Sequence, residues 1–278
     1  MSSATTNDVR GPGGFSLPLS PSGEAAMITP PPWHFSGEVV MVDYRVEPDA
    51  AARFLPPELD LGPDPGAAAA VFAQWQWCSD SGAELTDPAR CQFAEFLILL
   101  GCSYAGRSLA RCPYAWVDGA VPLVRGWIQG MPKQFGAVHM TRDMRVGRAG
   151  AQHNRRVDGT LSVYGRRVAE ASVRLTGEVV EPPLLHTVPL VHTRMFPSWV
   201  PDEETTAQLV TSVVTGVEFS EVKAGDAELS IFAEPDSDLA GLAPVEIGSG
   251  YVFSYAETLC HGRLLTETDG SRNSVRGE

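Results

Sequence analysis

Short apolar or alternating runs, broken by glycine, proline and aspartate, fill most of this chain from Ala68 onward. Alternation with a period of two is typical of strands that bury one face. Such runs lie at 70–77, 93–104, 160–164, 169–175, 214–219, 227–232 and 249–258, and another precedes them at 38–44. Helical periodicity is scarce, with short candidates at 49–54, 121–129 and 203–210. Closely spaced strands with few helices predict an α+β fold that is mainly antiparallel β-sheet.

Composition divides the chain into an arm, one domain and a tail. Residues 1–30 are rich in Ser, Thr, Gly and Pro, so we expect a flexible N-terminal arm or a segment packed on another subunit. The strand pattern resumes unchanged after Glu181-Pro182-Pro183. We therefore expect residues 31–267 to form a single domain and residues 268–278 to form a C-terminal tail.

Charge, cysteines and histidines exclude several functional classes. A net charge of −13 argues against nucleic-acid binding, which needs a basic face. The apolar runs fall far short of the ~20 residues that span a bilayer, and no signal pattern opens the chain, so we expect a cytoplasmic protein with no membrane partner. The five cysteines lack CxxC spacing and the histidines lack HxxxH or HxH spacing, so we expect no metal site.

The chain is nearly free of lysine. Of its 21 basic residues, only Lys133 and Lys223 are lysines. Lys133 lies in an apolar stretch, 126–136, that glycine and proline punctuate. Lysine, unlike arginine, can form an imine with a carbonyl carbon. The alternative is an ordinary solvated lysine, as on most protein surfaces.

Glu95 is a lone carboxylate inside the apolar run 93–100. It could face water from an edge strand, or it could be a buried general acid or base. Downstream, Gly130-Met131-Pro132-Lys133 predicts a turn that would present the lysine amine on a fixed backbone. Lys133 and Glu95 are therefore two separate candidates for a functional role.

The order and spacing of these segments resemble the acetoacetate decarboxylase superfamily. Phe93-Ala94-Glu95 through Gly106 fits its first motif, and Met131-Pro132-Lys133 fits its Gly-x-Pro-Lys segment. Further similar stretches at 189–197, 215–219, 227–232 and 238–245 extend the resemblance over about 33–265. The resemblance implies a β-barrel or cone-shaped sheet with a few short helices, and a homo-oligomer.

The same resemblance implies that Lys133 is the imine-forming nucleophile, that Glu95 is the acid/base, and that no cofactor is required. An iminium on Lys133 draws electrons from the adjacent carbon. A β-carboxylate can then leave as carbon dioxide, or an α proton can be removed to give an enamine nucleophile.

Substrate-binding residues follow from the surroundings of the lysine. We expect Met131 and Trp116 to line the pocket, and Gln134 to hydrogen-bond the substrate without adding charge. Arg125 could hold a substrate carboxylate, as could Arg107 or Arg111.

Departures from the family pattern point away from the namesake decarboxylation. Gln134 stands where the decarboxylases carry a second lysine, and Gly37 where they carry an arginine. Members with such changes resemble bacterial enzymes of secondary metabolism that join pyruvate to an aldehyde through a lysine enamine and eliminate water. We therefore predict a Schiff-base lyase of this aldol condensation-dehydration type, acting on a small-molecule keto substrate. A β-keto acid decarboxylase, a non-imine cyclase or isomerase, and a ligand-binding protein on the same scaffold remain alternatives.

Overall fold

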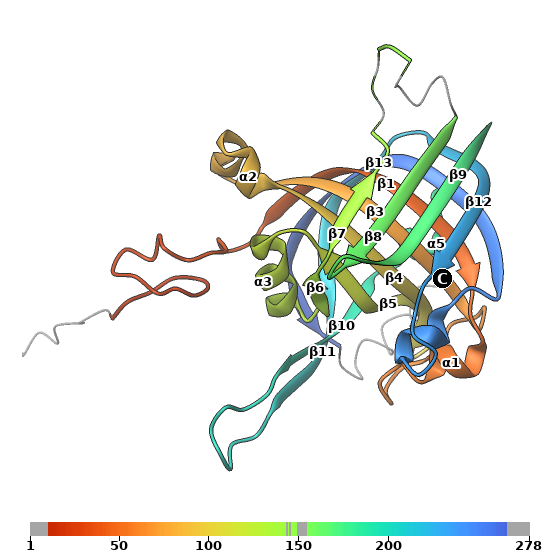
Figure 1. Cartoon of the computed structure of the whole chain (residues 1–278). Coiled ribbons are helices and arrows are strands. Elements are labelled where there is room, and N and C mark those ends of the chain that lie inside the picture. Colours follow the sequence, from red (N-terminus) through yellow and green to blue (C-terminus); the bar gives the residue numbers. More distant parts are fainter. Residues whose placement is uncertain (1–10, 143, 145, 149–154, 266–278) are drawn as a thin grey trace, which may run out of the picture.

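Long β-strands dominate the computed structural model, which describes residues 11–142, 144, 146–148 and 155–265 (Figure 1). Within these residues one sheet contains the 13 strands β1 (Trp33–Arg45), β2 (Asp60–Leu61), β3 (Ala67–Ser79), β4 (Gln92–Tyr104), β5 (Arg107–Val117), β6 (Lys133–Phe135), β7 (Ala137–Met140), β8 (Arg156–Val163), β9 (Arg166–Val180), β10 (Leu190–Phe196), β11 (Thr206–Phe219), β12 (Val222–Ile231) and β13 (Glu246–Leu264). The helical segments are short: α1 (Pro48–Ala52), η1 (Ala83–Thr86), α2 (Pro88–Cys91), α3 (Ala120–Gln129), α5 (Leu184–Thr187) and η2 (Asp238–Leu242). The predicted α+β class with mainly antiparallel strands is confirmed.

Part of the sheet closes into a barrel. β1 pairs with β3 on one side and with β13 on the other. From β3 the ring continues through β4, β5, β10 and β11 and returns to β13. These pairs are antiparallel except β5–β10, which are joined in parallel at Leu190–Ala110 and Val191–Arg111. Every strand of this ring therefore has two neighbours, which removes open edges.

The remaining strands form a second layer over the outside of the barrel. β12, β9, β8 and β7 extend from β13 and cover the outer face of β1, β3 and β4 (Figure 1). Successive side chains of a strand point to opposite faces. In β1, Val40 packs between the two layers while Val39 packs inside the barrel. In β4, likewise, Ile98 packs between the two layers and Leu97 packs inside the barrel. The barrel interior is thus partly apolar core and partly available for a site.

Most predicted strands are confirmed, and one predicted helix is wrong. Residues 203–210 were expected to be helical, but β11 begins at Thr206 and pairs with both β10 and β13. Two neighbouring strands satisfy its backbone groups, and this tertiary context overrides a weak local helical preference. The helix expected at 121–129 is present as α3. The helix expected at 49–54 is the shorter α1, which begins at Pro48.

Residues 11–32 contain no helix and no named strand, only an isolated bridge between Gly13 and Ser20. Figure 1 shows much of this segment extending away from the barrel. Its end is anchored, because Ile28 is fully buried in a cluster with Trp33 and Trp77. The first ten residues of the predicted arm and all of the predicted tail 268–278 lie outside the described residues.

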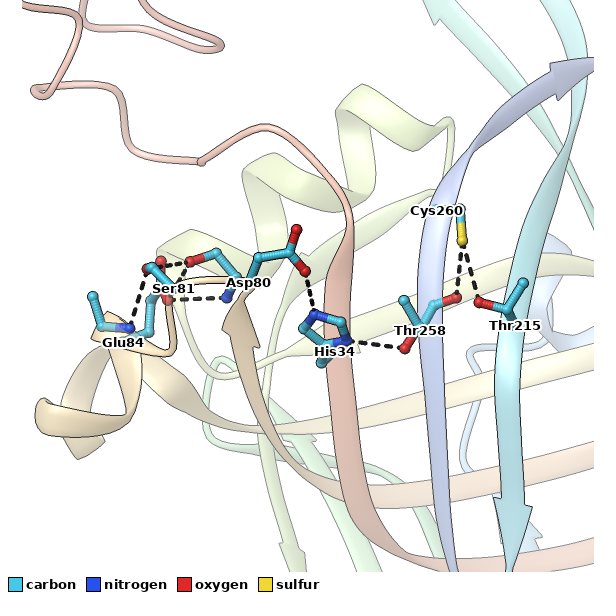
Figure 2. Close-up of polar contacts among 9 residues, drawn as sticks. His34, Asp80, Ser81, Glu84, Thr215, Thr258 and Cys260 are labelled. Atoms are coloured by element: carbon cyan, nitrogen blue, oxygen red, sulfur yellow. Dashed lines mark hydrogen bonds and ion pairs between the residues drawn. The ribbon is translucent and has the colours of Figure 1, made fainter.

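Polar side chains add contacts along the barrel seams (Figure 2). His34 of β1 lies 2.8 Å from Asp80 through Nε2 and 2.9 Å from Thr258 of β13 through Nδ1. Across β13, the Sγ of Cys260 lies 3.4 Å from the Oγ1 of Thr215 in β11. These residues join adjacent strands and do not line the cavity that contains Lys133. Among the described residues, no helix is both long and apolar enough to cross a membrane.

Candidate active site

Lys133 opens β6 directly after the turn that ends α3. The turn reverses at Gly130, whose φ of +93° lies in the left-handed region, and a Cβ there would lie 2.6 Å from the amide nitrogen of Arg194. Glycine is therefore required at this position. Lys133 then pairs in parallel with Ala115 of β5, and Trp127 donates from Nε1 to the Lys133 carbonyl oxygen at 2.9 Å. Helix, turn and strand together fix the lysine backbone.

Gly126 makes room for the lysine side chain. A Cβ at this position of α3 would lie 2.3 Å from Cδ and 2.6 Å from Cγ of Lys133. Real Cβ atoms do not approach neighbours this closely, so α3 can pack against the lysine stem only through a residue without a side chain. The stem is consequently held between α3 and the barrel wall.

The lysine amine is paired with Glu95 inside the barrel. Lys133 Nζ lies 2.7 Å from Glu95 Oε1, and the two residues are only 6% and 5% exposed. Glu95 lies on β4 between β3 and β5, so it is not on an edge strand. Its other oxygen, Oε2, accepts a 2.9 Å hydrogen bond from Nε1 of Trp75. Amine and carboxylate are thus within proton-transfer distance, in a site largely closed to water.

Arg125 of α3 is 1% exposed and is enclosed by aromatic rings. Its guanidinium carbon lies 3.8 Å from the ring centroid of Trp77, and 5.0–5.9 Å from those of Trp33, Phe35 and Phe93. Within the described residues, none of its three side-chain nitrogens has a hydrogen-bond partner. The aromatic faces stabilise a cation but leave its planar donors unused.

The environment of Arg125 is costly for a cation. Burial lowers the pKa of Arg125 to about 9, while the negative charges of Glu95 and Glu84 act in the opposite direction. The guanidinium is still charged at neutral pH. A buried, charged and unpaired guanidinium at a cavity wall is suited to a planar anion such as a carboxylate.

Glu257 of β13 supplies a second carboxyl group to the site. Its Oε2 accepts a 2.7 Å hydrogen bond from the Tyr255 hydroxyl. Burial raises the pKa of Glu257, the Tyr255 hydrogen bond acts against this, and the nearby charge of Glu95 raises the pKa further. Two acidic groups therefore share one cavity in different environments, which is the arrangement that separates acid and base roles.

These residues line a cavity of about 620 Å³ inside the barrel. Lys133, Glu95, Arg125 and Glu257 contribute to its wall, together with aromatic and aliphatic side chains from β3, β4, β11 and β13. The volume is within the range of small-molecule sites. No cluster of three or more His, Cys, Asp or Glu that could hold a metal ion occurs in the part of the chain that the structure describes.

The structure places some of the predicted binding residues in this cavity and others elsewhere. Met131 and Arg125 line it. Gln134 does not, because it follows Lys133 on β6 and its exposed side chain points to the other side of the strand. Trp116 also points away: it follows Ala115 on β5 and stacks on Tyr114 in the core between the two layers. The expected places of Gln134 and Trp116 are therefore wrong.

Sequence reasoning missed several residues of the cavity. The cavity amide belongs to Gln129, at the end of α3, and not to Gln134. Glu257 lies in an alternating stretch of β13 that reads as an ordinary half-buried strand. A polar residue on the buried side of the alternation was the available signal, but alternation alone does not tell which side is buried.

The family profile described as Acetoacetate decarboxylase (ADC) matches residues 16–268. The chain belongs to this family. Among solved structures, the enduracididine biosynthesis enzyme MppR, complexed with the condensation product of pyruvate and imidazole 4-carboxaldehyde, is 62% identical with a TM-score of 0.88; the match covers 93% of this chain and 98% of that one. MppR complexed with pyruvate is 61% identical with a TM-score of 0.87, covering 93% and 100%.

More distant members share the fold. The acetoacetate decarboxylase of Legionella pneumophila subsp. pneumophila str. Philadelphia 1 is 17% identical, with a TM-score of 0.73 and coverage of 95% of this chain and 98% of that one. A search of curated proteins returned no match. The predicted family and fold class are confirmed, and the chain is an enzyme of the lyase or aldolase type.

Proposed function

We propose that this enzyme joins a small α-keto acid such as pyruvate to an aldehyde through an imine on Lys133 and then eliminates water. The observation that carries the proposal is the buried pair of Lys133 and Glu95, 2.7 Å apart, in one cavity with the unpaired guanidinium of Arg125. The MppR complexes with pyruvate and with a pyruvate–aldehyde condensation product support the choice of substrates.

Arg125 binds the carboxylate of the keto acid. Its unused donors form charge-assisted hydrogen bonds with that carboxylate, which offsets part of the burial cost of the cation. The adjacent ketone carbon then lies toward Lys133. An ordinary methyl ketone lacks the carboxylate, so this contact selects α-keto acids.

Imine formation uses the Lys133–Glu95 pair. A proton moves from the ammonium of Lys133 to Glu95, and the neutral amine attacks the ketone carbon. Protonated Glu95 returns its proton to the departing hydroxyl, and water leaves an iminium on Lys133. Glu95, again a carboxylate, removes a methyl proton to give the enamine. The carbon–carbon bond to the aldehyde forms next, and this step restores the iminium.

Glu257 completes the dehydration. Its raised pKa favours the protonated carboxyl, which gives its proton to the new alkoxide. The Glu257 carboxylate then removes the proton next to the iminium, while protonated Glu95 gives its proton to the departing hydroxyl. Hydrolysis of the iminium releases the unsaturated keto acid and returns Lys133 as an ammonium, Glu95 as a carboxylate and Glu257 as an acid. The net reaction is pyruvate plus aldehyde giving the condensed product and one water.

Borohydride trapping tests the proposal directly. The protein is incubated with pyruvate, reduced and digested, and the adduct is located by mass spectrometry. We expect the adduct on Lys133 and none on Lys223, which is exposed on β12 and serves as an internal control. Lys133→Arg is expected to abolish both adduct and turnover, and Lys223→Arg to preserve them. Turnover by Lys133→Arg at the wild-type rate would refute imine catalysis.

A decarboxylase assay separates the proposed reaction from its nearest alternative. Carbon dioxide release from acetoacetate is measured beside condensation of pyruvate with imidazole 4-carboxaldehyde. We expect condensation to be the faster reaction by far. Decarboxylation without condensation would reassign the site to the family's namesake reaction. The homo-oligomeric state and the cytoplasmic location stay predictions from the sequence.

A further inference from the structure

The cavity is larger than the keto acid requires. Arg125, Lys133 and Glu95 define the place of the keto acid, yet the cavity of about 620 Å³ continues toward α5 and β10. The additional wall is mostly aliphatic, with Leu185, Val188 and Leu190 among its residues. Its polar members include two histidines, His186 and His192. This part of the cavity is the available place for the second reactant.

His192 is the more deeply buried of these polar groups. It lies in β10 between β5 and β11, and it is 2% exposed. Its neighbour Val191 is fully buried in a separate apolar cluster on the other face of the strand. Strand alternation therefore directs His192 into the barrel. Within the described residues, its Nδ1 has no hydrogen-bond partner.

His192 is a neutral imidazole at working pH. Burial, together with the nearby positive charges of Arg111 and Lys133, lowers the pKa of His192 to about 3. A neutral imidazole keeps one N–H donor and one acceptor nitrogen. A structural histidine in a closed core normally satisfies both, because an unsatisfied buried polar atom costs about 1–3 kcal/mol. An unused polar atom at a cavity wall points to a ligand.

We propose that His192 binds the oxygen of the aldehyde and orients that second substrate for attack by the enamine; this rests on the proposed function. During attack, the enamine carbon bonds to the aldehyde carbon, and the carbonyl π electrons move to the oxygen. The His192 N–H donates a hydrogen bond to that oxygen as its negative charge grows. His192 keeps its proton, and the proton that completes the hydroxyl comes from the Glu257 carboxyl group.

The two half-reactions can be measured separately. Exchange of pyruvate methyl protons in D₂O, followed by NMR, reports enamine formation and needs no aldehyde. Condensation of pyruvate with imidazole 4-carboxaldehyde reports the complete sequence. For His192→Phe we expect the Lys133 adduct and methyl exchange to persist, while condensation falls roughly 100-fold, the typical effect of removing one oxyanion donor. His192→Gln restores an N–H donor and should recover much of the condensation.

Controls separate this role from a structural one. His139 is exposed, lies outside the cavity, and its change to Phe should alter neither reaction. Melting temperatures verify that each variant is folded, and His192→Leu, which also lacks an N–H donor, replaces His192→Phe if the latter is not. A folded His192→Phe that condenses at the wild-type rate overturns the inference, as does equal loss of exchange and condensation. Failure of the wild-type protein to form any Lys133 adduct overturns the proposed function itself, and the inference with it.

Discussion

Replacing Arg125 with methionine should leave the folded protein at least as stable while removing its preference for keto acids. Methionine is long, flexible and apolar, so it can fill the space between the four aromatic rings around the guanidinium. Arg125 has no hydrogen-bond partner within the described residues, so the change leaves no protein group unpaired. Stability and binding are therefore expected to respond in opposite directions.

The magnitude follows from the environment of the guanidinium. Burial lowers the pKa of Arg125 from 12.5 to about 9, which corresponds to roughly 5 kcal/mol against the charged form. Cation–π contacts with the aromatic rings offset part of this cost, by about 0.5–2 kcal/mol for a well-placed ring. We expect Arg125→Met to increase the free energy of unfolding by on the order of 1–3 kcal/mol, as in other replacements of buried charges by apolar residues. That gain raises the melting temperature by a few degrees in a chain of this size.

Binding should change far more. Loss of a buried charge-assisted contact with a carboxylate costs about 2–5 kcal/mol, which is roughly 30-fold or more in affinity. Thermal melts with and without pyruvate measure both quantities in one experiment. Borohydride trapping with pyruvate and with acetone then measures selectivity, because only pyruvate carries the carboxylate. The wild type should prefer pyruvate, and Arg125→Met should trap the two ketones about equally.

A clear result would refute this reasoning. If Arg125→Met still prefers pyruvate over acetone by the wild-type ratio, Arg125 is not the carboxylate receptor. If the variant melts well below the wild type, the guanidinium stabilises the fold even though it has no hydrogen-bond partner within the described residues. Arg107→Met is a matched control, because Arg107 also lines the cavity but is exposed.

Three further predictions concern the lysine, the second acid and the barrel. Gly126→Ala would place a Cβ 2.3 Å from Cδ of Lys133, so the amine must move, and pyruvate trapping should slow roughly 100-fold; trapping at the wild-type rate would contradict this. Glu257→Gln removes the carboxylate that takes the proton next to the iminium during dehydration, so mass spectrometry should detect the undehydrated hydroxy-keto acid. The wild-type rate should fall as pH rises through the raised pKa of Glu257, because the protonated carboxyl group supplies the proton of the new hydroxyl, and the variant should lose that decline. Burial raises the pKa of Asp43 from 3.8 to about 6 in the folded protein. As pH rises from about 4 to about 6, Asp43 therefore loses its proton in the unfolded chain before it does so in the folded protein, and the free energy of unfolding decreases. Asp43→Asn should therefore increase the free energy of unfolding by up to about 3 kcal/mol at pH 8 and by little at pH 4, as measured by urea unfolding. An equal change at both pH values would contradict the raised pKa of Asp43.

Much of the candidate site could be predicted from residue types and their spacing. The scarcity of lysine singled out Lys133, and a lone acid in an apolar run singled out Glu95. The Gly-x-Pro-Lys turn located the amine, and the structure gives its physical basis in the left-handed φ of Gly130. These are local properties, because residue type and backbone conformation depend on near neighbours in the chain.

The local sequence pattern did not determine which face of each strand points into the barrel. Gln134 and Trp116 were expected at the pocket, yet a shift of one residue places each on the opposite face from Lys133 and Ala115. Period-two alternation separates two sets of side chains but does not say which set faces the interior. That choice depends on which face the second layer of strands covers.

The sequence by itself determined the strand-rich class and the family, and it singled out Lys133 and Glu95 as the candidate catalytic residues. Only the tertiary structure decided what surrounds them. Closing the barrel brings Glu257 from β13 and His192 from β10 to the cavity that contains Lys133, although each lies more than fifty residues farther along the chain. The physical reason is that barrel closure is a long-range pairing, set by the summed burial of many strands, and no single segment encodes it.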